Sequence, residues 1–214
     1  MTVSADVYYC HGVKSPRLTS AKLKAAGIGA FFRPRDLEPL EIPFAELQRL
    51  VATGTVEKVG AGLYRLAAAE PGEFETIAMV SSAVPGGIVC LLSALGLHGI
   101  GTQAPHEVWL ALDRKARKPA RLPAKVRMVR FSGAMLNYGI QKRTMVGVPV
   151  SITSPARTVV DCFRYRNKVG IDVAMEALRD AIRSRITTVD QISRSAEACR
   201  IRTVIAPYLE ALSA

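Results

Sequence analysis

One stretch, residues 31–68, constrains the fold of this chain most, because it joins a helical pattern to a hairpin pattern. Between residues 43 and 52 the apolar side chains recur at the i, i+3, i+4 spacing of a helix with one buried face, at Phe44, Leu47, Leu50 and Val51. Gly54 follows at the place where helices commonly end. We therefore predict a helix over 43–52, preceded by helices over 16–26 and 31–40.

A hairpin is predicted directly after this helix. The runs 55–59 and 63–66 have β character, and Gly60-Ala61-Gly62 lies between them as a turn. A helix followed at once by a small hairpin is the order of a DNA-recognition helix and its wing. The sequence therefore predicts an α+β protein with an N-terminal winged helix-turn-helix over residues 1–70, and DNA as its leading partner.

The polar residues of this unit suit DNA contacts. With the helix 43–52 in the major groove, Gln48 can pair with adenine, Arg49 can pair with guanine, and Glu46 can accept from cytosine. Basic residues placed for phosphate contacts are Arg33, Arg35, Lys58 and Arg65. Each of these residues also fits an ordinary exposed side chain, and the sequence leaves both interpretations open.

A larger mixed α+β domain is predicted over residues 71–214, beyond a boundary at 67–72. It begins with helices over 74–84 and 88–97, and the second is so apolar that we expect it in the core. Strands are predicted over 107–112, 126–131, 140–145 and 148–153. Further helices are predicted over 156–165, 171–183, 189–199 and 203–212.

Positive charge is concentrated in the middle of the chain. The formal net charge of +11 favours a polyanionic partner, nucleic acid before membrane. Residues 1–70 contain nine Lys or Arg and seven Asp or Glu, residues 71–170 contain fourteen and five, and residues 171–214 contain six and six. The densest segment is predicted to begin as a loop because it contains two prolines. Its basic residues are Arg114, Lys115, Arg117, Lys118, Arg121, Lys125, Arg127 and Arg130.

This basic segment has two interpretations. It is either a solvated loop between strands or a second surface for phosphates or for a partner bound to nucleic acid. It holds no aromatic residue for base stacking, so it would attract backbone charge without reading sequence.

The sequence indicates no cofactor, metal centre or membrane segment. The four cysteines form no CxxC pair, and motifs of the P-loop, dinucleotide-binding and kinase-loop types are absent. No run approaches the ~20 apolar residues of a membrane span. We therefore expect a cytoplasmic protein without a membrane partner.

Several titratable residues of the larger domain favour structural roles. Arg157 and Asp161 are i, i+4 neighbours and fit an ion pair. His98 fits a satisfied position at the end of a helix. A carboxylate stripe fits a solvated helix face better than a magnesium site, and its members are Asp172, Glu176 and Asp180.

Three stretches of the chain carry a family resemblance. They are the hairpin VEKVGAGLYRLAA at 56–68, the helical LLSALGLHG at 91–99, and TSPARTVVDCFRYR at 153–166, followed by GIDVAMEAL at 170–178. Together they resemble the AbiEi family, which comprises antitoxins and autoregulators of type IV toxin–antitoxin systems. The resemblance covers most of residues 40–210.

The resemblance implies two activities. One is repression of the protein's own operon through the winged helix, for which we expect inverted repeats in the promoter because one small winged helix seldom makes enough contact alone. The other is neutralisation of a cognate nucleotidyltransferase-like toxin. Three possibilities stay open at this point: a DNA-binding antitoxin and repressor, an atypical phosphotransferase that phosphorylates the toxin on serine, and an inhibitor that masks the toxin by direct contact. The residues assign no catalytic role.

Overall fold

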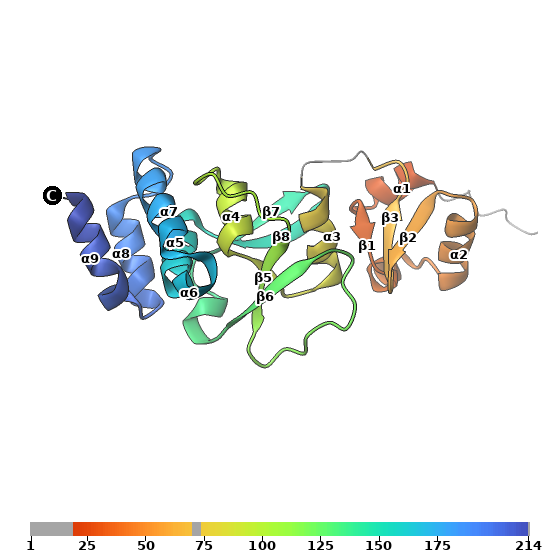
Figure 1. Cartoon of the computed structure of the whole chain (residues 1–214). Helices are drawn as coiled ribbons and strands as arrows, with labels where there is room; N and C mark the ends of the chain where they lie inside the picture. Colours follow the sequence, from red (N-terminus) through yellow and green to blue (C-terminus); the bar gives the residue numbers. More distant parts are fainter. Residues whose placement is uncertain (1–18, 70–73, 214) are drawn as a thin grey trace, which may run out of the picture.

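The helix predicted over residues 43–52 is present as α2 (Phe44–Ala52) in the computed structural model, which describes residues 19–69 and 74–213 (Figure 1). It follows helix α1 (Ser20–Ala25) and a 3-10 helix, η1 (Pro34–Leu40). The predicted hairpin is present as strands β2 (Val56–Gly60) and β3 (Leu63–Leu66). Together with β1 (Phe31–Phe32) they form an antiparallel sheet in the order β1-β3-β2.

The helix predicted over residues 31–40 is wrong at its start. Phe31 and Phe32 form β1 against β3, and both rings are buried, which suits aromatic residues on a sheet. Helical geometry begins only at Pro34, whose fixed φ favours a first turn. It stays 3-10 because Pro39 has no N–H to donate to an i−4 carbonyl. The helix predicted from residue 16 begins at Ser20 after a Thr19 cap, and residues 16–18 lie outside the described residues.

A second, five-stranded sheet lies within residues 74–213, in the order β6-β5-β4-β8-β7. Strands β5 and β6 are parallel, and the connection between them is the basic loop, residues 114–125. Strand β4 is central, antiparallel to β5 and parallel to β8, while β7 and β8 form a hairpin. The strands are β4 (Ile88–Val89), β5 (Val108–Asp113), β6 (Val126–Phe131), β7 (Ile140–Met145) and β8 (Val148–Thr153).

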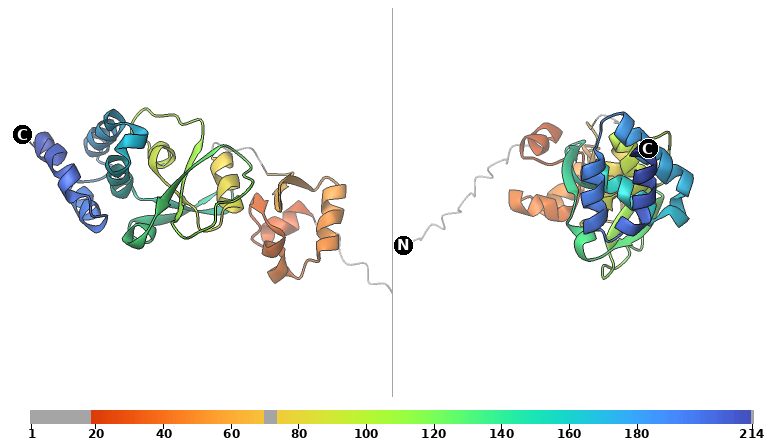
Figure 2. Two further views of the ribbon diagram at one scale, coloured as in Figure 1. Left: turned by 60° about the horizontal axis from the view of Figure 1, so that its bottom comes forward. Right: turned by 90° about the vertical axis from the view of Figure 1, so that its left-hand side faces the viewer.

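Helices cover this sheet and extend the molecule away from the N-terminal unit (Figures 1 and 2). Helix α3 packs on β8, α4 packs on β5, and α5 contacts α4, α7 and α8. A short turn, η2 (Gly133–Leu136), follows β6. The helices are α3 (Glu75–Ala83), α4 (Leu91–His98), α5 (Pro155–Arg164), α6 (Arg166–Val169), α7 (Ile171–Arg183), α8 (Val189–Ala198) and α9 (Arg202–Ser213).

The apolar run 88–97 predicts one buried helix, but the structure divides it. Ile88 and Val89 form the central strand β4, and the helix begins at Leu91. The two strand residues are buried in different hydrophobic clusters, one on each face of the sheet. A strand covered on both faces has an unbroken apolar sequence, so periodicity does not distinguish it from a core helix.

The N-terminal unit and the larger domain meet through backbone contacts. Ala30 N donates to Val146 O in the β7–β8 turn at 3.0 Å. Beside this bond, Gly29 lies so close to Gly147 that an added Cβ would come 2.3 Å from the Gly147 carbonyl oxygen. A hydrophobic cluster also runs through both parts, from Leu47 of α2 to Leu110 of β5. In the described part of the chain, no helix is long and apolar enough to cross a membrane.

Candidate nucleic-acid interface

Helix α2 presents a polar side to solvent. Leu47 and Leu50 are fully buried on its other side, and the helix packs beside strand β2, so its rotation is fixed. Gln48 is exposed, and Glu46 and Arg49 are partly exposed. The three residues predicted to read bases therefore lie on one accessible helix.

Two of these side chains bind each other. Arg49 Nε donates to Glu46 Oε2 at 2.7 Å, and Arg49 Nη2 lies 2.5 Å from Glu46 Oε1. This hydrogen bonding lowers the pKa of Glu46 and raises the pKa of Arg49. The exposed pair would have to open before Arg49 could bind a guanine.

Phe44 differs from its prediction. The helical stripe places it in the core, but its side chain is 59% exposed. It is the first residue of α2, directly after the N-cap Pro43. Helical side chains cover the turn on the N-terminal side of their own position, and here no such turn exists. Phe44 is therefore an accessible aromatic side chain at the N-terminal end of α2.

The β2–β3 hairpin has a buried base and an exposed tip. Tyr64 is buried and stacks on Phe32, with ring centroids 6.0 Å apart, which agrees with its predicted packing role. Gly62 has φ +66°, a conformation that glycine adopts without strain, so it suits the tight turn. Lys58 is exposed on β2, where it remains available to a partner.

Two of the predicted phosphate-contacting residues hold the protein together. Arg33 Nε donates to Ser82 O at 3.0 Å and Arg33 Nη2 donates to Ala83 O, so its guanidinium joins the N-terminal unit to the end of α3. Arg65, 16% exposed, donates to Glu75 at 2.9 Å and to Ala69 O at 2.9 Å. Both guanidinium groups are thus engaged inside the molecule. Arg35 is exposed, 3.8 Å from Asp36.

The basic loop is the densest segment of exposed basic side chains among the described residues. Its six basic side chains are exposed and make no hydrogen bond or ion pair with the described residues: Arg114, Lys115, Arg117, Lys118, Arg121 and Lys125. Two further members of the predicted patch, on β6, have partners. Arg127 pairs with Glu107 at 2.5 Å and lies over the Trp109 ring, whereas Arg130 donates to the carbonyls of Asp113 and Ala116.

The carboxylate stripe on α7 binds a neighbouring loop. Glu176 Oε1 accepts from Thr102 N at 2.9 Å and from Thr102 Oγ1 at 2.7 Å, while Asp180 Oδ2 accepts from Gly101 N at 2.8 Å. These bonds lower the pKa of both carboxyl groups. Within residues 19–69 and 74–213, no group of three or more His, Cys, Asp or Glu side chains is arranged to hold a metal ion. Two members of the stripe, Glu176 and Asp180, thus bind a loop of the protein, whereas the third, Asp172, is exposed as predicted.

His98 is satisfied at the end of α4, as predicted. Its Nε2 lies 2.7 Å from Thr153 O, and Arg143 donates to Nδ1 at 3.2 Å. Since a carbonyl only accepts and a guanidinium only donates, these partners require the neutral Nε2–H tautomer. Burial lowers the pKa of His98, which favours the same neutral form.

Two of the stretches that carry the family resemblance meet in the core. Helix α4, from the stretch 91–99, packs on α5, from the stretch 153–166. On α5 the side chains of Arg157 and Asp161 are fully buried, with Arg157 Nε 2.8 Å from Asp161 Oδ1. Arg157 also donates to Tyr138 O at 2.6 Å and to Met135 O at 3.2 Å, which confirms a structural pair. Neither group is accessible to a substrate.

Asp161 is incompletely satisfied. Its Oδ2 atom is buried and accepts no hydrogen bond from the described residues. Burial raises the pKa of Asp161 to about 6, against the opposing effect of Arg157. Burial also raises the pKa of the neighbouring Cys162 thiol, so this thiol favours its neutral form.

Comparison with known proteins supports the fold. The structure is similar to the crystal structure of RV2827C protein from Mycobacterium tuberculosis, with a TM-score of 0.53 and 14% sequence identity, covering 86% of this chain and 75% of that chain. A likeness at this identity establishes the mixed α+β fold. No family model matches the chain, and no curated protein matches its sequence.

Proposed function

We propose that this protein is a DNA-binding antitoxin that represses its own operon and neutralises a cognate nucleotidyltransferase-like toxin. The observation that carries the DNA-binding part is the order of elements in residues 19–69. Helix α2 is followed directly by the β2–β3 hairpin, and both present polar residues to solvent. This is the order of a recognition helix and its wing, so residues 1–70 are proposed as a winged helix-turn-helix.

In this proposal α2 enters the major groove with its first turn toward the bases. Gln48 is free to meet an adenine edge, and Arg49 reaches a guanine after releasing Glu46. Lys58 and Arg35 suit phosphate contacts. Arg33 and Arg65 have structural roles in this proposal, since both form hydrogen bonds within the protein.

The antitoxin part rests on the resemblance of 56–68, 91–99 and 153–178 to the AbiEi family. The likeness to RV2827C supports the mixed α+β fold alone. Because Arg157 and Asp161 are fully buried, this ion pair supplies stability rather than a reaction site. We therefore propose neutralisation by contact through the larger domain, residues 71–214.

Two experiments test the two activities. Footprinting on DNA upstream of the gene is expected to give protection over an inverted repeat, because one small recognition unit seldom makes enough contact alone. Co-expression with the proposed cognate nucleotidyltransferase-like toxin is expected to yield a purified pair. Loss of the toxin's activity with phosphoserine on the toxin and no stable pair would contradict neutralisation by contact.

A further inference from the structure

We propose that Phe44, the first residue of α2, selects thymine in the operator by packing its ring against the C5-methyl group of that base. The inference rests on the proposed DNA-binding function and deepens it, because it names a base that the recognition helix prefers and the chemical group that it reads. Gln48 and Arg49 would read other bases, through hydrogen bonds.

Phe44 is the most exposed of the large hydrophobic residues that the structure describes. It is 59% exposed, and an aromatic ring left in water recovers free energy when an apolar partner covers it. Two other helices also begin with an exposed apolar residue, Ile171 on α7 and Val189 on α8. Exposure alone therefore does not identify a binding residue, and the surroundings of Phe44 have to decide its role.

Phe44 lies at the centre of an apolar tip, residues 43–45, at the end of α2. Pro43 and Ala45 are exposed on either side of it. Helical side chains lean toward the N-terminus of their helix, so the Phe44 ring extends toward the open end of α2. The tip has no side-chain group that could bind a phosphate, so it suits the base edges in the major groove better than the sugar–phosphate backbone. The apolar group that bases present in that groove is the C5-methyl of thymine, which Phe and Ala side chains both contact.

Gln48 lies on the same side of α2 as Phe44. The two residues are i, i+4 neighbours, separated by ~6 Å along the helix axis, and both are exposed. Successive base pairs are ~3.4 Å apart, so one helix face can meet neighbouring base pairs with its two side chains. A glutamine amide pairs with adenine, and an apolar ring packs on the methyl group of thymine. The two residues together therefore predict A·T base pairs beneath the first two turns of α2.

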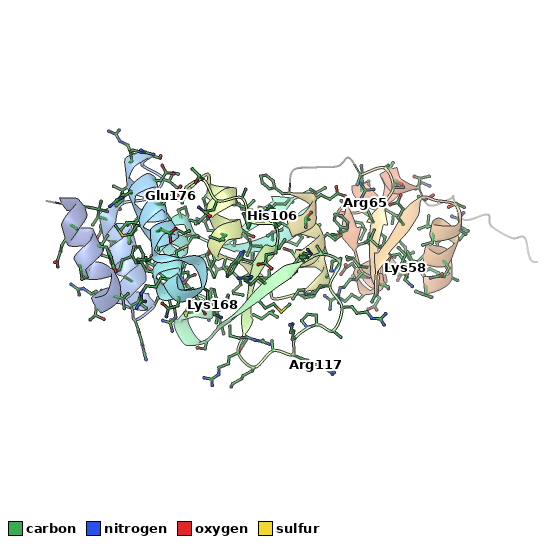
Figure 3. All side chains as sticks on the ribbon, viewed as in Figure 1. Lys58, Arg65, His106, Arg117, Lys168 and Glu176 are labelled. Atoms are coloured by element: carbon green, nitrogen blue, oxygen red, sulfur yellow. The ribbon has the colours of Figure 1, made fainter. Side chains whose placement is uncertain are left out.

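The hairpin beside α2 supplies a contact that positions the helix without reading a base. Strand β2 packs beside α2, and Figure 3 shows Lys58 on this strand. Lys58 is exposed and suits a phosphate. Because a phosphate contact fixes the register of a protein on DNA but carries no sequence information, the preference for thymine is left to the helix.

Replacement of thymine by uracil tests the contact. Deoxyuridine lacks only the C5-methyl group and keeps the same base pair, so it removes the proposed partner of Phe44 and nothing else. Each thymine of the footprinted upstream DNA is replaced in turn, and binding of the full-length protein is measured by fluorescence anisotropy. One thymine in each half-site should be sensitive for the wild type. Its replacement should weaken binding about fourfold, as expected for the loss of one buried methyl group.

Two variants of Phe44 and one control complete the test. Phe44→Ala should bind the thymine duplex at least about fourfold more weakly than the wild type and should no longer distinguish thymine from uracil. Phe44→Leu keeps an apolar side chain and should retain part of the preference. The control is Ile171→Ala, which removes an exposed apolar side chain from the first position of α7 and should keep the wild-type preference. Cooperative melting of all three variants confirms that they fold.

The outcomes separate this inference from the function on which it rests. If the wild type does not bind its upstream DNA, the proposed function fails and this inference fails with it. If the wild type binds but no deoxyuridine weakens binding, or if Phe44→Ala keeps the preference for thymine, only this inference is overturned. Sedimentation velocity then identifies the other use of an exposed ring. A smaller oligomer for Phe44→Ala, with the thymine preference retained, would assign Phe44 to a contact between two copies of the chain.

Discussion

Helices α2 and α5 each contain an arginine bound to a carboxylate of the same helix, but the two pairs lie in opposite environments. Arg49 and Glu46 lie at the surface of α2, where solvent reaches both groups. Arg157 and Asp161 on α5 are wholly buried, and Arg157 also binds the carbonyls of Met135 and Tyr138. A surface pair of this kind contributes little to stability and can open for a ligand. A buried one fixes the structure around it, because breaking it leaves a charge without water.

The largest effect is expected for Arg157→Met. It leaves the Asp161 carboxylate buried without its partner and removes two carbonyl contacts, so the free energy of unfolding should fall by about 3–5 kcal/mol. Urea unfolding followed by circular dichroism measures this loss. The double variant Arg157→Met with Asp161→Leu is the control, and it should recover much of the loss. A single variant as stable as the wild type would contradict the structural role of the pair.

A smaller effect is expected from Thr158, one residue along α5. Its hydroxyl lies 2.7 Å from Thr153 Oγ1 and can donate to Thr153 O or Ser154 O. Thr158→Val keeps the shape of the side chain but removes one hydrogen-bond donor from these buried acceptors. The free energy of unfolding should therefore fall by about 1–2 kcal/mol. Thr203→Val, at an exposed position of α9, serves as the matched control and should stay close to the wild type. Equal effects at both positions would mean that the buried hydroxyl contributes nothing.

The two carboxylates should respond to pH in opposite directions. Burial raises the pKa of Asp161 to about 6, above its unfolded value of 3.8, so its contribution to stability is fully present below pH 3.8 and is lost as the pH rises through about 6. Hydrogen bonding to Arg49 lowers the pKa of Glu46 below 4.5. The contribution of Glu46 to stability is therefore present above pH 4.5 and is lost as the pH falls. Stability curves of the wild type, Asp161→Asn and Glu46→Gln between pH 3 and 7 measure both slopes. Parallel curves for the wild type and Asp161→Asn would exclude a titration of Asp161 in this range.

The smallest effect on stability is expected for Arg49→Ala. The melting temperature should hardly change, because the Arg49–Glu46 pair is exposed. On operator DNA, affinity should fall about ten- to one-hundredfold, and discrimination at one base position should be lost. Arg179→Ala, on the exposed side of α7, is the control for both measurements. Equal losses on operator and random DNA would show that Arg49 does not read a base.

The spacing of apolar residues and the positions of turn glycines predict much of this fold. The stripe Leu47–Leu50 and the glycines at 60 and 62 locate α2 and its hairpin, and the pattern of β8 and α5 is present at its predicted place. The misassigned elements have physical reasons. β1 is two residues long, and its pairing with β3 crosses more than thirty positions of sequence, beyond any local signal. β4 is apolar on both faces, so it has no alternation to identify it.

The candidate site was less predictable than the fold, because sequence gives a residue's chemistry but not its partners. Arg33 and Arg35 are two positions apart and look equivalent, yet one binds carbonyls of α3 and the other is exposed. Sequence likewise does not distinguish Arg127 and Arg130, which have partners in the structure, from the six unpaired residues of the basic loop. Phe44 was missed because helical periodicity assigns a face without accounting for the first turn of the helix.

The Gly29–Gly147 contact has a consequence for natural variation. The two residues belong to different units, yet the backbone of one occupies the space that a side chain on the other would need. Relatives that keep this junction should therefore inherit glycine at both places, and a lineage that loses one should soon accept change at the other. Aligned sequences would then record, in this one correlated pair, which relatives still hold their two units in the same orientation.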